Sequence, residues 1–313
     1  MGKKNLKIIL AQPRGFCAGV KRAIKIVETA LERYGEPVWV LHEIVHNTHV
    51  IKNLTGAGAR FVEDIDEIPP GSITIFSAHG VSTAVEQRAK DKGLKVIDAT
   101  CPLVKKVHHQ AMRYNKCGHE IIIIGHHGHP EVEGTLGRVD GKVVVVSTIE
   151  DIRSLELANP EKVAYVTQTT LSTDDTRELI EELNRRFPNI KGPDLKDICY
   201  ATQSRQDAVR KLAEEVDMLL VVGSQNSSNS NRLRETGSAR GLDAYLVDNA
   251  DHVDLAWFNG KSVVGITAGA SAPEVLVQDI IRMLGEHFEL DVRPQNGKQE
   301  TMQFKLPRFP DFN

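Results

Sequence analysis

The sequence predicts an α/β protein built from parallel sheets with flanking helices. Short apolar runs rich in β-branched residues alternate with amphipathic segments along most of the 313 residues, and this rhythm is typical of strands joined by crossover helices. The runs are apolar almost throughout, so we expect strands that are covered on both faces. Three cysteines at comparable intervals further indicate that one such unit is repeated.

The expected strands share a β-branched core that is bounded by turn or polar residues. They are 37–45, 72–80, 95–101, 120–128, 142–148, 162–170, 217–224, 243–248 and 262–269. The expected helices share an apolar stripe at helical spacing. They include 21–35, 83–93, 174–187 and 273–284.

The repeat is read from Cys17, Cys101 and Cys199, which lie 84 and 98 residues apart. Each ends an expected strand and precedes the start of a helical pattern. Cys117 lies outside the repeat, and we expect it to be structural or incidental.

Counting strands between the cysteines divides the chain into three similar units with pseudo-threefold symmetry. Residues 19–101 hold about four strand candidates, and residues 102–198 hold four that end at Cys199. Residues 199–286 hold three, and the N-terminal strand in residues 1–18 is expected to complete this third unit. Residues 287–313 show no helical or strand rhythm, and we interpret them as a tail laid across the units.

Three cysteines at helix N-termini could hold a thiolate-ligated metal centre, because the helix dipole favours negative charge there. Structural zinc sites take four ligands in paired spacings that this chain lacks, and electron-transfer iron–sulfur clusters usually use four cysteines. Three thiolates would leave one iron of a central 4Fe-4S iron–sulfur cluster open to bind a substrate oxygen. The alternative is three unrelated cysteines that pack as small hydrophobic side chains.

Composition narrows the classes of partner. The formal net charge is only −3 and no long run of one sign occurs, which argues against nucleic acid or an anionic membrane as the main partner. Four cysteines in so long a chain do not make a disulfide framework. No apolar stretch resembles a secretory or membrane-spanning segment, so we expect a cytoplasmic protein with reduced thiols.

Polar clusters follow the expected strands, where ligands of parallel α/β sheets bind. Each cluster alone could be a loop or a helix cap, but together they would supply many donors to an anionic group such as a diphosphate. The donors are His46, His79, His129, Ser227, Asn229 and Ser271. No P-loop or dinucleotide fingerprint is present. Glu131 is the one carboxylate in these clusters and therefore the natural proton donor or relay.

Nine motifs taken together resemble the 4-hydroxy-3-methylbut-2-enyl diphosphate reductase (LytB) family, in order and over nearly the whole chain. They are PRGFCAGVKRAI, HEIVHN, SAHGVS, DATCPLV, GHHGHPEVEG, VTQTTLS, the strand end at Cys199, SQNSSNSNRL and GASAPE. The resemblance implies the last step of the non-mevalonate isoprenoid pathway. In that step the allylic hydroxyl of a diphosphate substrate is removed reductively to give isopentenyl and dimethylallyl diphosphate.

The resemblance also implies roles for individual residues. Cys17, Cys101 and Cys199 would hold a 4Fe-4S cluster whose open iron binds the substrate oxygen. Glu131 would be the acid, and Thr169 would help to place the substrate hydroxyl or a water. The residues implied to hold the diphosphate are His46, His79, His129, Ser227, Ser228, Asn229 and Ser271. Electrons would come from an electron donor protein, ferredoxin or flavodoxin.

Two rival functions remain open from the sequence. The first is a mononuclear zinc or iron hydrolase that uses His126, His129 and Glu131, with structural cysteines. The second is a non-enzymatic protein that carries a cluster and binds a diphosphate or senses redox state. Sulfide analysis separates the first rival, because a hydrolase needs no inorganic sulfide, and turnover with a chemical reductant separates the second.

Overall fold

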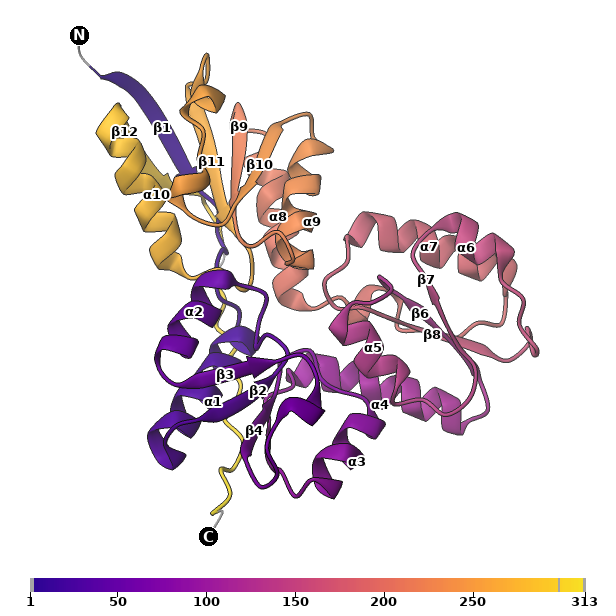
Figure 1. The fold of residues 1–313 in the computed structure, drawn as a ribbon. Coiled ribbons are helices and arrows are strands. Elements are labelled where there is room, and N and C mark those ends of the chain that lie inside the picture. The colour runs from indigo at the N-terminus through magenta and orange to yellow at the C-terminus, as the bar shows by residue number, and fades with distance from the viewer. Residues whose placement is uncertain (1–2, 298, 312–313) are drawn as a thin grey trace. The chain divides into compact units, whose positions relative to one another are not determined.

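A computed structural model describes residues 3–297 and 299–311, and the strands of this part of the chain form three parallel sheets (Figure 1). The prediction of an α/β protein with parallel sheets and flanking helices is confirmed. The chain forms two compact units. Unit 1 comprises Met1–Val20, His46–Val50 and Tyr200–Gln303, and unit 2 comprises Lys21–Val45, Ile51–Cys199 and Phe304–Asn313.

Unit 1 contains a five-stranded sheet of order β10-β9-β11-β1-β12. Its strands are β1 (Lys4–Leu10), β9 (Met218–Val222), β10 (Asp243–Val247), β11 (Val263–Ala268) and β12 (Phe288–Pro294). Its helices are α8 (Tyr200–Leu212), α9 (Ser228–Ser238) and α10 (Glu274–His287), with short 3₁₀ turns η3 (Ala250–His252) and η4 (Leu255–Phe258). The N-terminal strand β1 lies between β11 and β12 and is parallel to both.

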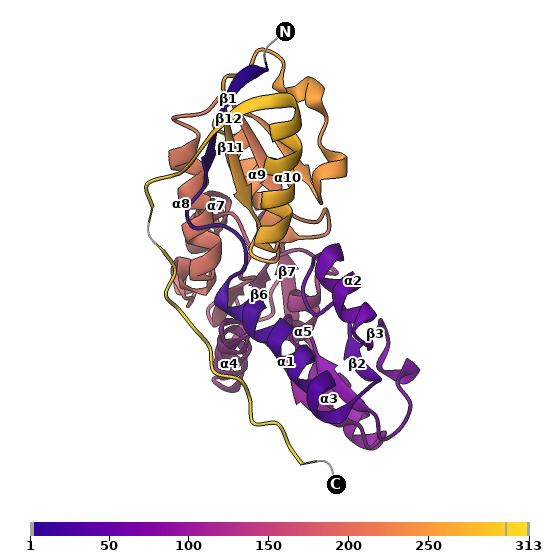
Figure 2. The same ribbon diagram turned by 90° about the vertical axis from the view of Figure 1, so that its left-hand side faces the viewer.

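Helices cover both faces of this sheet, as Figure 2 shows for α8 and α10. Neighbouring residues of a strand point to opposite faces. Accordingly, Ile8 belongs to a core with α10, whereas Ile9 belongs to a core with α8 and α9. This double coverage explains why the strands are apolar throughout.

Unit 2 contains a four-stranded sheet of order β3-β2-β4-β5 and a three-stranded sheet of order β7-β6-β8. The first has β2 (Val38–Leu41), β3 (Ala59–Val62), β4 (Ile73–Phe76) and β5 (Lys95–Asp98), with helices α1 (Ala18–Tyr34), α2 (Thr48–Gly56), α3 (Thr83–Asp91) and the 3₁₀ turn η1 (Ile65–Glu67) next to them in the chain. The second has β6 (Glu120–Ile124), β7 (Val143–Val146) and β8 (Val163–Thr167), with α4 (Pro102–Lys116), α5 (Pro130–Leu136), α6 (Ile149–Ser154), α7 (Thr173–Arg186) and the 3₁₀ turn η2 (Asp194–Asp197).

The four consecutive isoleucines of β6 alternate between two cores. Ile122 and Ile124 pack with α6 and α7, while Ile121 and Ile123 pack with α4 and α5. A run this apolar therefore requires helices on both faces, which the three-stranded sheet has.

Two sequence predictions differ from the structure. The strand expected to end at Cys199 is wrong, because residues Asp194–Asp197 form η2 and a single bridge joins Lys191 to Ala164. Pro193 directly precedes η2, and proline has no N–H to give to a ladder. The prediction of no strand after Glu286 is also wrong, because Phe288–Pro294 pairs with β1 along its whole length.

Candidate active site

Cys17, Cys101 and Cys199 all lie at helix N-termini, as the sequence predicted. Cys17 and Cys199 directly precede α1 and α8, and Cys101 is the N-cap of α4. All three are half-buried and none forms a disulfide within the described residues, whereas Cys117 is exposed at the C-terminal end of α4. The three cysteines of the repeat therefore share a local position that Cys117 lacks.

The backbone N–H of each of these three cysteines donates a hydrogen bond to a carbonyl in a loop that follows a strand. The accepting carbonyls are Ala270 for Cys17 (3.1 Å), Ala78 for Cys101 (3.0 Å) and Thr169 for Cys199 (3.1 Å). The three loops follow β11, β4 and β8. One local arrangement thus occurs three times, and each time it ties a cysteine to a polar loop that the sequence analysis selected.

In unit 1, a backbone amide contacts the sulfur of Cys17, and the Tyr200 hydroxyl contacts the next residue. The Val20 N–H donates to Cys17 Sγ at 3.4 Å, and the Ala18 N–H donates to Tyr200 Oη at 3.3 Å. Both the amide and the helix dipole interact favourably with a sulfur that carries negative charge. Burial raises the pKa of Tyr200 to about 12, so its hydroxyl stays protonated at neutral pH.

In unit 2, Glu131 and Thr169 form a buried pair. Glu131 is the second residue of α5 and is 2 % exposed, and Thr169 follows β8 and is 5 % exposed. The Thr169 N–H donates to Glu131 Oε1 at 2.6 Å, and Thr169 Oγ1 donates to Glu131 Oε2 at 2.9 Å. Thr169 also accepts the Cys199 N–H through its carbonyl, so one residue links the acid to a cysteine.

The pKa of Glu131 is raised to about 7, mainly because burial penalises its charged form. The two hydrogen bonds from Thr169 lower this pKa, and the negative charge of Asp197 raises it further. A carboxyl group with a pKa near neutrality is protonated in a large fraction of molecules. Glu131 is therefore able to act as a general acid.

The raised pKa of Glu131 predicts a pH dependence of the free energy of unfolding. Between pH 4.5 and about 7 the folded chain holds this proton and the unfolded chain does not, so stability falls as pH rises, by at most about 1.4 kcal/mol per pH unit. Glu131→Gln removes the titration. From about pH 5 to about pH 8 the native chain should lose stability relative to this variant. Urea unfolding of both metal-free proteins measures the difference, and a difference that is constant with pH contradicts the assignment.

His129 and His79 lie near each other in unit 2. His129 is the N-cap of α5, and its Nδ1 accepts the Glu131 N–H at 3.2 Å. In the neutral ring the proton is then on Nε2, which can donate to a ligand. The rings of His79 and His129 are 6.0 Å apart at 87°, and Ser77 Oγ is 3.4 Å from His79 Nδ1.

In unit 1, the predicted diphosphate residues gather at the N-terminus of α9 and in the loop after β11. Ser227 caps α9 by accepting the Ser230 N–H, and Ser228 is the first residue of that helix. Asn229 Oδ1 accepts the Ala270 N–H at 2.8 Å. Ser271 Oγ donates to the His46 carbonyl at 2.9 Å. Helix-end donors and hydroxyls of this kind suit an anionic group.

The structure thus brings the predicted residues together in two sets. His79, His129, Glu131 and Thr169 lie in unit 2 with Cys101 and Cys199. His46, Ser227, Ser228, Asn229 and Ser271 lie in unit 1 with Cys17. The sequence analysis did not select Tyr200 or Ala270, whose contacts with the Cys17 segment involve a hydroxyl and a backbone carbonyl. Only the position of Tyr200, directly after Cys199, could have drawn attention to it.

In this arrangement Glu131 is not available as a ligand of a mononuclear metal ion. Both oxygens of Glu131 are already bonded to Thr169. The hydrolase interpretation would require these bonds to break.

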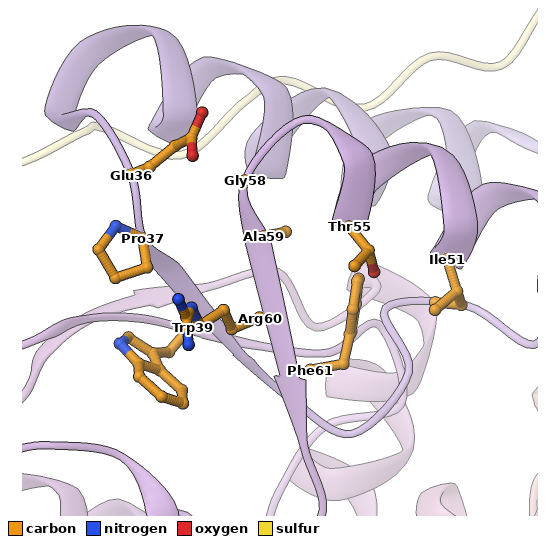
Figure 3. A pocket seen from close by; sticks show the side chains of 9 residues that line it. All are labelled: Glu36, Pro37, Trp39, Ile51, Thr55, Gly58, Ala59, Arg60 and Phe61. Atoms are coloured by element: carbon orange, nitrogen blue, oxygen red, sulfur yellow. The ribbon is translucent and has the colours of Figure 1, made fainter.

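A cavity of about 810 Å³ lies at the amino ends of strands β2 and β3 in the four-stranded sheet (Figure 3). It is lined by residues at the starts of β2 and β3, among them Pro37, Trp39, Ala59 and Arg60. Ligands of parallel sheets bind beyond the carboxyl ends of the strands. This cavity is therefore separate from the loops that carry the predicted site residues.

Among the described residues, no helix is both long enough and apolar enough to cross a membrane.

Comparisons with known proteins agree with one another. The LytB protein family matches residues 8–285. A 4-hydroxy-3-methylbut-2-enyl diphosphate reductase of Burkholderia pseudomallei is 57% identical over 302 residues, which are 96% of each chain. The protein of that name from Neisseria gonorrhoeae is 56% identical, over 96% of this chain and 94% of its own.

Two solved structures are also similar. The structure of the E-1-hydroxy-2-methyl-but-2-enyl-4-diphosphate reductase from Plasmodium falciparum matches with a TM-score of 0.91 and 37% identity, over 98% of this chain and 96% of that one. A structure of (E)-4-hydroxy-3-methyl-but-2-enyl diphosphate reductase, described as the terminal enzyme of the non-mevalonate pathway, matches with a TM-score of 0.65 and 36% identity. It covers 90% of this chain and 99% of its own.

Proposed function

The chain belongs to the LytB protein family, and on that premise we propose that it is a 4-hydroxy-3-methylbut-2-enyl diphosphate reductase. It removes the allylic hydroxyl group of this diphosphate by reduction, in the terminal step of the non-mevalonate isoprenoid pathway. The products are isopentenyl diphosphate and dimethylallyl diphosphate.

The observation that carries the proposal is the buried pair of hydrogen bonds between Thr169 and Glu131. The Thr169 carbonyl also accepts a hydrogen bond from the Cys199 N–H. Hydroxide is a poor leaving group, so the allylic oxygen must leave protonated. Glu131 has a pKa of about 7 and can hold that proton near neutral pH. The hydroxyl of Thr169 orients the carboxyl group.

Members of the family are iron–sulfur enzymes, and the cysteines of this chain suit such a cofactor. Cys17, Cys101 and Cys199 are half-buried, lie at helix N-termini and form no disulfide within the described residues, and thiolate sulfur is the preferred ligand of iron–sulfur clusters. We propose that these three hold a 4Fe-4S cluster and leave one iron open. When bound, the cluster would supply electrons and a Lewis-acidic position for the substrate.

The polar loops would bind the diphosphate. In unit 1, the N-terminus of α9 with Ser227, Ser228 and Asn229 would supply backbone and side-chain donors. His46 and Ser271 belong to the same unit. In unit 2, the rings of His79 and His129 would supply imidazole N–H donors, that of His129 from Nε2 because its Nδ1 accepts the Glu131 N–H.

His46→Ala tests the diphosphate assignment. Loss of one charge-assisted hydrogen bond should weaken substrate binding about tenfold or more, because such a bond contributes on the order of 1.5–3 kcal/mol. The iron–sulfur absorption spectrum should not change. Anaerobic calorimetric titration with substrate measures the affinity, and His252→Ala is the matched control because His252 is exposed in η3. Unaltered affinity in His46→Ala would place the diphosphate elsewhere.

The function itself is tested by anaerobic turnover of the diphosphate substrate with a chemical reductant. We expect both five-carbon diphosphate products. Release of inorganic phosphate without reduction would favour the hydrolase, and binding without any turnover would favour a sensor.

An electron donor protein is required in the cell, and we propose a ferredoxin or flavodoxin for this role. The predicted cytoplasmic location stays a prediction.

A further inference from the structure

Each of the three cysteines precedes a helix, and each of these helices carries a basic residue five or six positions after its cysteine. These residues are Arg22 in α1, Lys106 in α4 and Arg205 in α8. None of them belongs to the site residues described above. Each cation contacts one or two backbone carbonyls that lie one to three residues before a different cysteine.

The contacts run in cyclic order. Arg22 Nη1 donates to the carbonyls of Ala99 (3.1 Å) and Thr100 (3.2 Å), which precede Cys101. Lys106 Nζ donates to the Lys196 carbonyl at 2.7 Å, upstream of Cys199. The guanidinium of Arg205 donates twice to the Gly15 carbonyl (2.6 and 3.1 Å), upstream of Cys17.

Burial indicates that at least two of these contacts stabilise the fold. Arg205 is fully buried and Arg22 is 8 % exposed, and a buried guanidinium is costly unless its donors are satisfied. Burial lowers the pKa of Arg22, and the negative charge of Asp98 opposes that effect. Lys106 is more exposed, and it also lies 3.3 Å from the buried carboxylate of Asp197.

The C-terminal segment completes the partner sets of both arginines. In unit 1, Glu300 binds Arg205 through both oxygens, at 2.7 and 2.9 Å, and accepts a hydrogen bond from Ser204 Oγ at 2.8 Å. In unit 2, the Lys305 carbonyl accepts the Arg22 Nε–H at 2.9 Å. Gly15 has a φ of 69°, a conformation that favours glycine, and two N–H groups of Arg205 donate to its carbonyl.

We propose that Arg22, Lys106 and Arg205 are positioning residues that each fix the loop of the next cysteine in the cycle, and that Glu300 supports Arg205 in this role. Each cation anchors the backbone upstream of a thiol on another helix, so the three thiols are held in place before any cofactor binds. The inference about cofactor retention rests on the proposed cluster, whereas the positioning itself does not.

The test measures the alkylation rate of each cysteine in the metal-free protein by peptide mass spectrometry, with iodoacetamide as the probe. Lys106→Met should raise the rate at Cys199 about tenfold, because a charge-assisted bond to its loop is lost, and should leave Cys17 and Cys101 within about twofold. Glu300→Gln should raise the alkylation rate of Cys17 about tenfold and leave Cys101 and Cys199 within about twofold. Lys106→Arg should restore the native rate at Cys199.

The matched controls are Lys116→Met on the same helix as Lys106 and Glu289→Gln on β12, because both residues are exposed. We expect native rates in both. The proposal is overturned if Lys106→Met exposes Cys101 on its own helix, if all three cysteines react faster together, or if no rate changes. Arg205→Met is a harsher variant, and Glu300→Gln keeps the Cys17 contact testable if Arg205→Met does not fold.

A second readout follows iron loss to a chelator from the anaerobically reconstituted protein. Both Lys106→Met and Glu300→Gln should lose iron faster than the native chain and the two controls. Equal rates would overturn the retention role. If the native chain takes up no cluster, the proposed function fails while the alkylation rates still decide the positioning role.

Discussion

Single replacement of Cys17, Cys101 or Cys199 with Ser is expected to abolish turnover and to deplete bound iron and sulfide. A serine hydroxyl is far less acidic than a thiol, and its oxygen is a harder ligand than sulfur. With only three protein ligands, no other ligand of the cluster can compensate for the loss. Iron and acid-labile sulfide analysis of the anaerobically purified variants, together with their absorption spectra, measures the loss.

Cys117→Ser is the control, because Cys117 is exposed at the far end of α4. It should keep the native iron content and activity. If Cys117 proved as necessary as the other three, a cluster with three thiol ligands and one open iron would be the wrong assignment.

Glu131→Gln should keep the cluster and bind substrate, yet turn over at least about a hundredfold more slowly, the usual scale of lost acid catalysis. Glutamine retains the size of the side chain and can still bond to Thr169, but it cannot deliver a proton. The native rate should also fall as pH rises above about 7, because Glu131 then loses its proton. Anaerobic single-turnover rates across pH measure both effects.

Glu133→Gln is the matched control, since this neighbour also lies in α5 but contacts the Gly128 backbone and not Thr169. It should retain the native rate and pH profile. Near-native turnover in Glu131→Gln would remove Glu131 from the proton path and leave His129 or a water held by Thr169 as the donor.

The strands were predictable because burial on both faces leaves a continuous apolar run. The four isoleucines of β6 are the plainest case, since helices cover both of their faces. The edge strand β12 was missed although Phe288 to Arg293 alternate apolar and charged residues. Such alternation indicates a strand with one covered face, and a criterion based on continuous apolar runs does not detect it.

The stretch before Cys199 shows the opposite error. A cysteine at a repeating position suggested a strand end, but Gly192 and Pro193 favour a turn, and η2 follows. The feature that repeats is therefore the helix start together with the hydrogen bond from the cysteine N–H to a loop carbonyl. The strand itself does not repeat.

The sequence indicated which loops carry the candidate site, but it did not indicate the hydrogen bonds within that site. A short motif after a strand identified Glu131, and the family resemblance added Thr169, yet only the fold shows that Thr169 donates hydrogen bonds to both oxygens of Glu131. Contacts between distant parts of the chain, such as that of Arg205 with Glu300, leave no periodic pattern in a single sequence. They depend on which helices and loops the topology brings together.

The most direct test of the central assignment, a cluster held by Cys17, Cys101 and Cys199, is the ratio of iron to acid-labile sulfide in the anaerobically purified native chain. We expect iron and sulfide in equal amounts, with the broad visible absorption of an iron–sulfur cluster. Zinc, or iron without sulfide, would contradict the cluster and favour a mononuclear site.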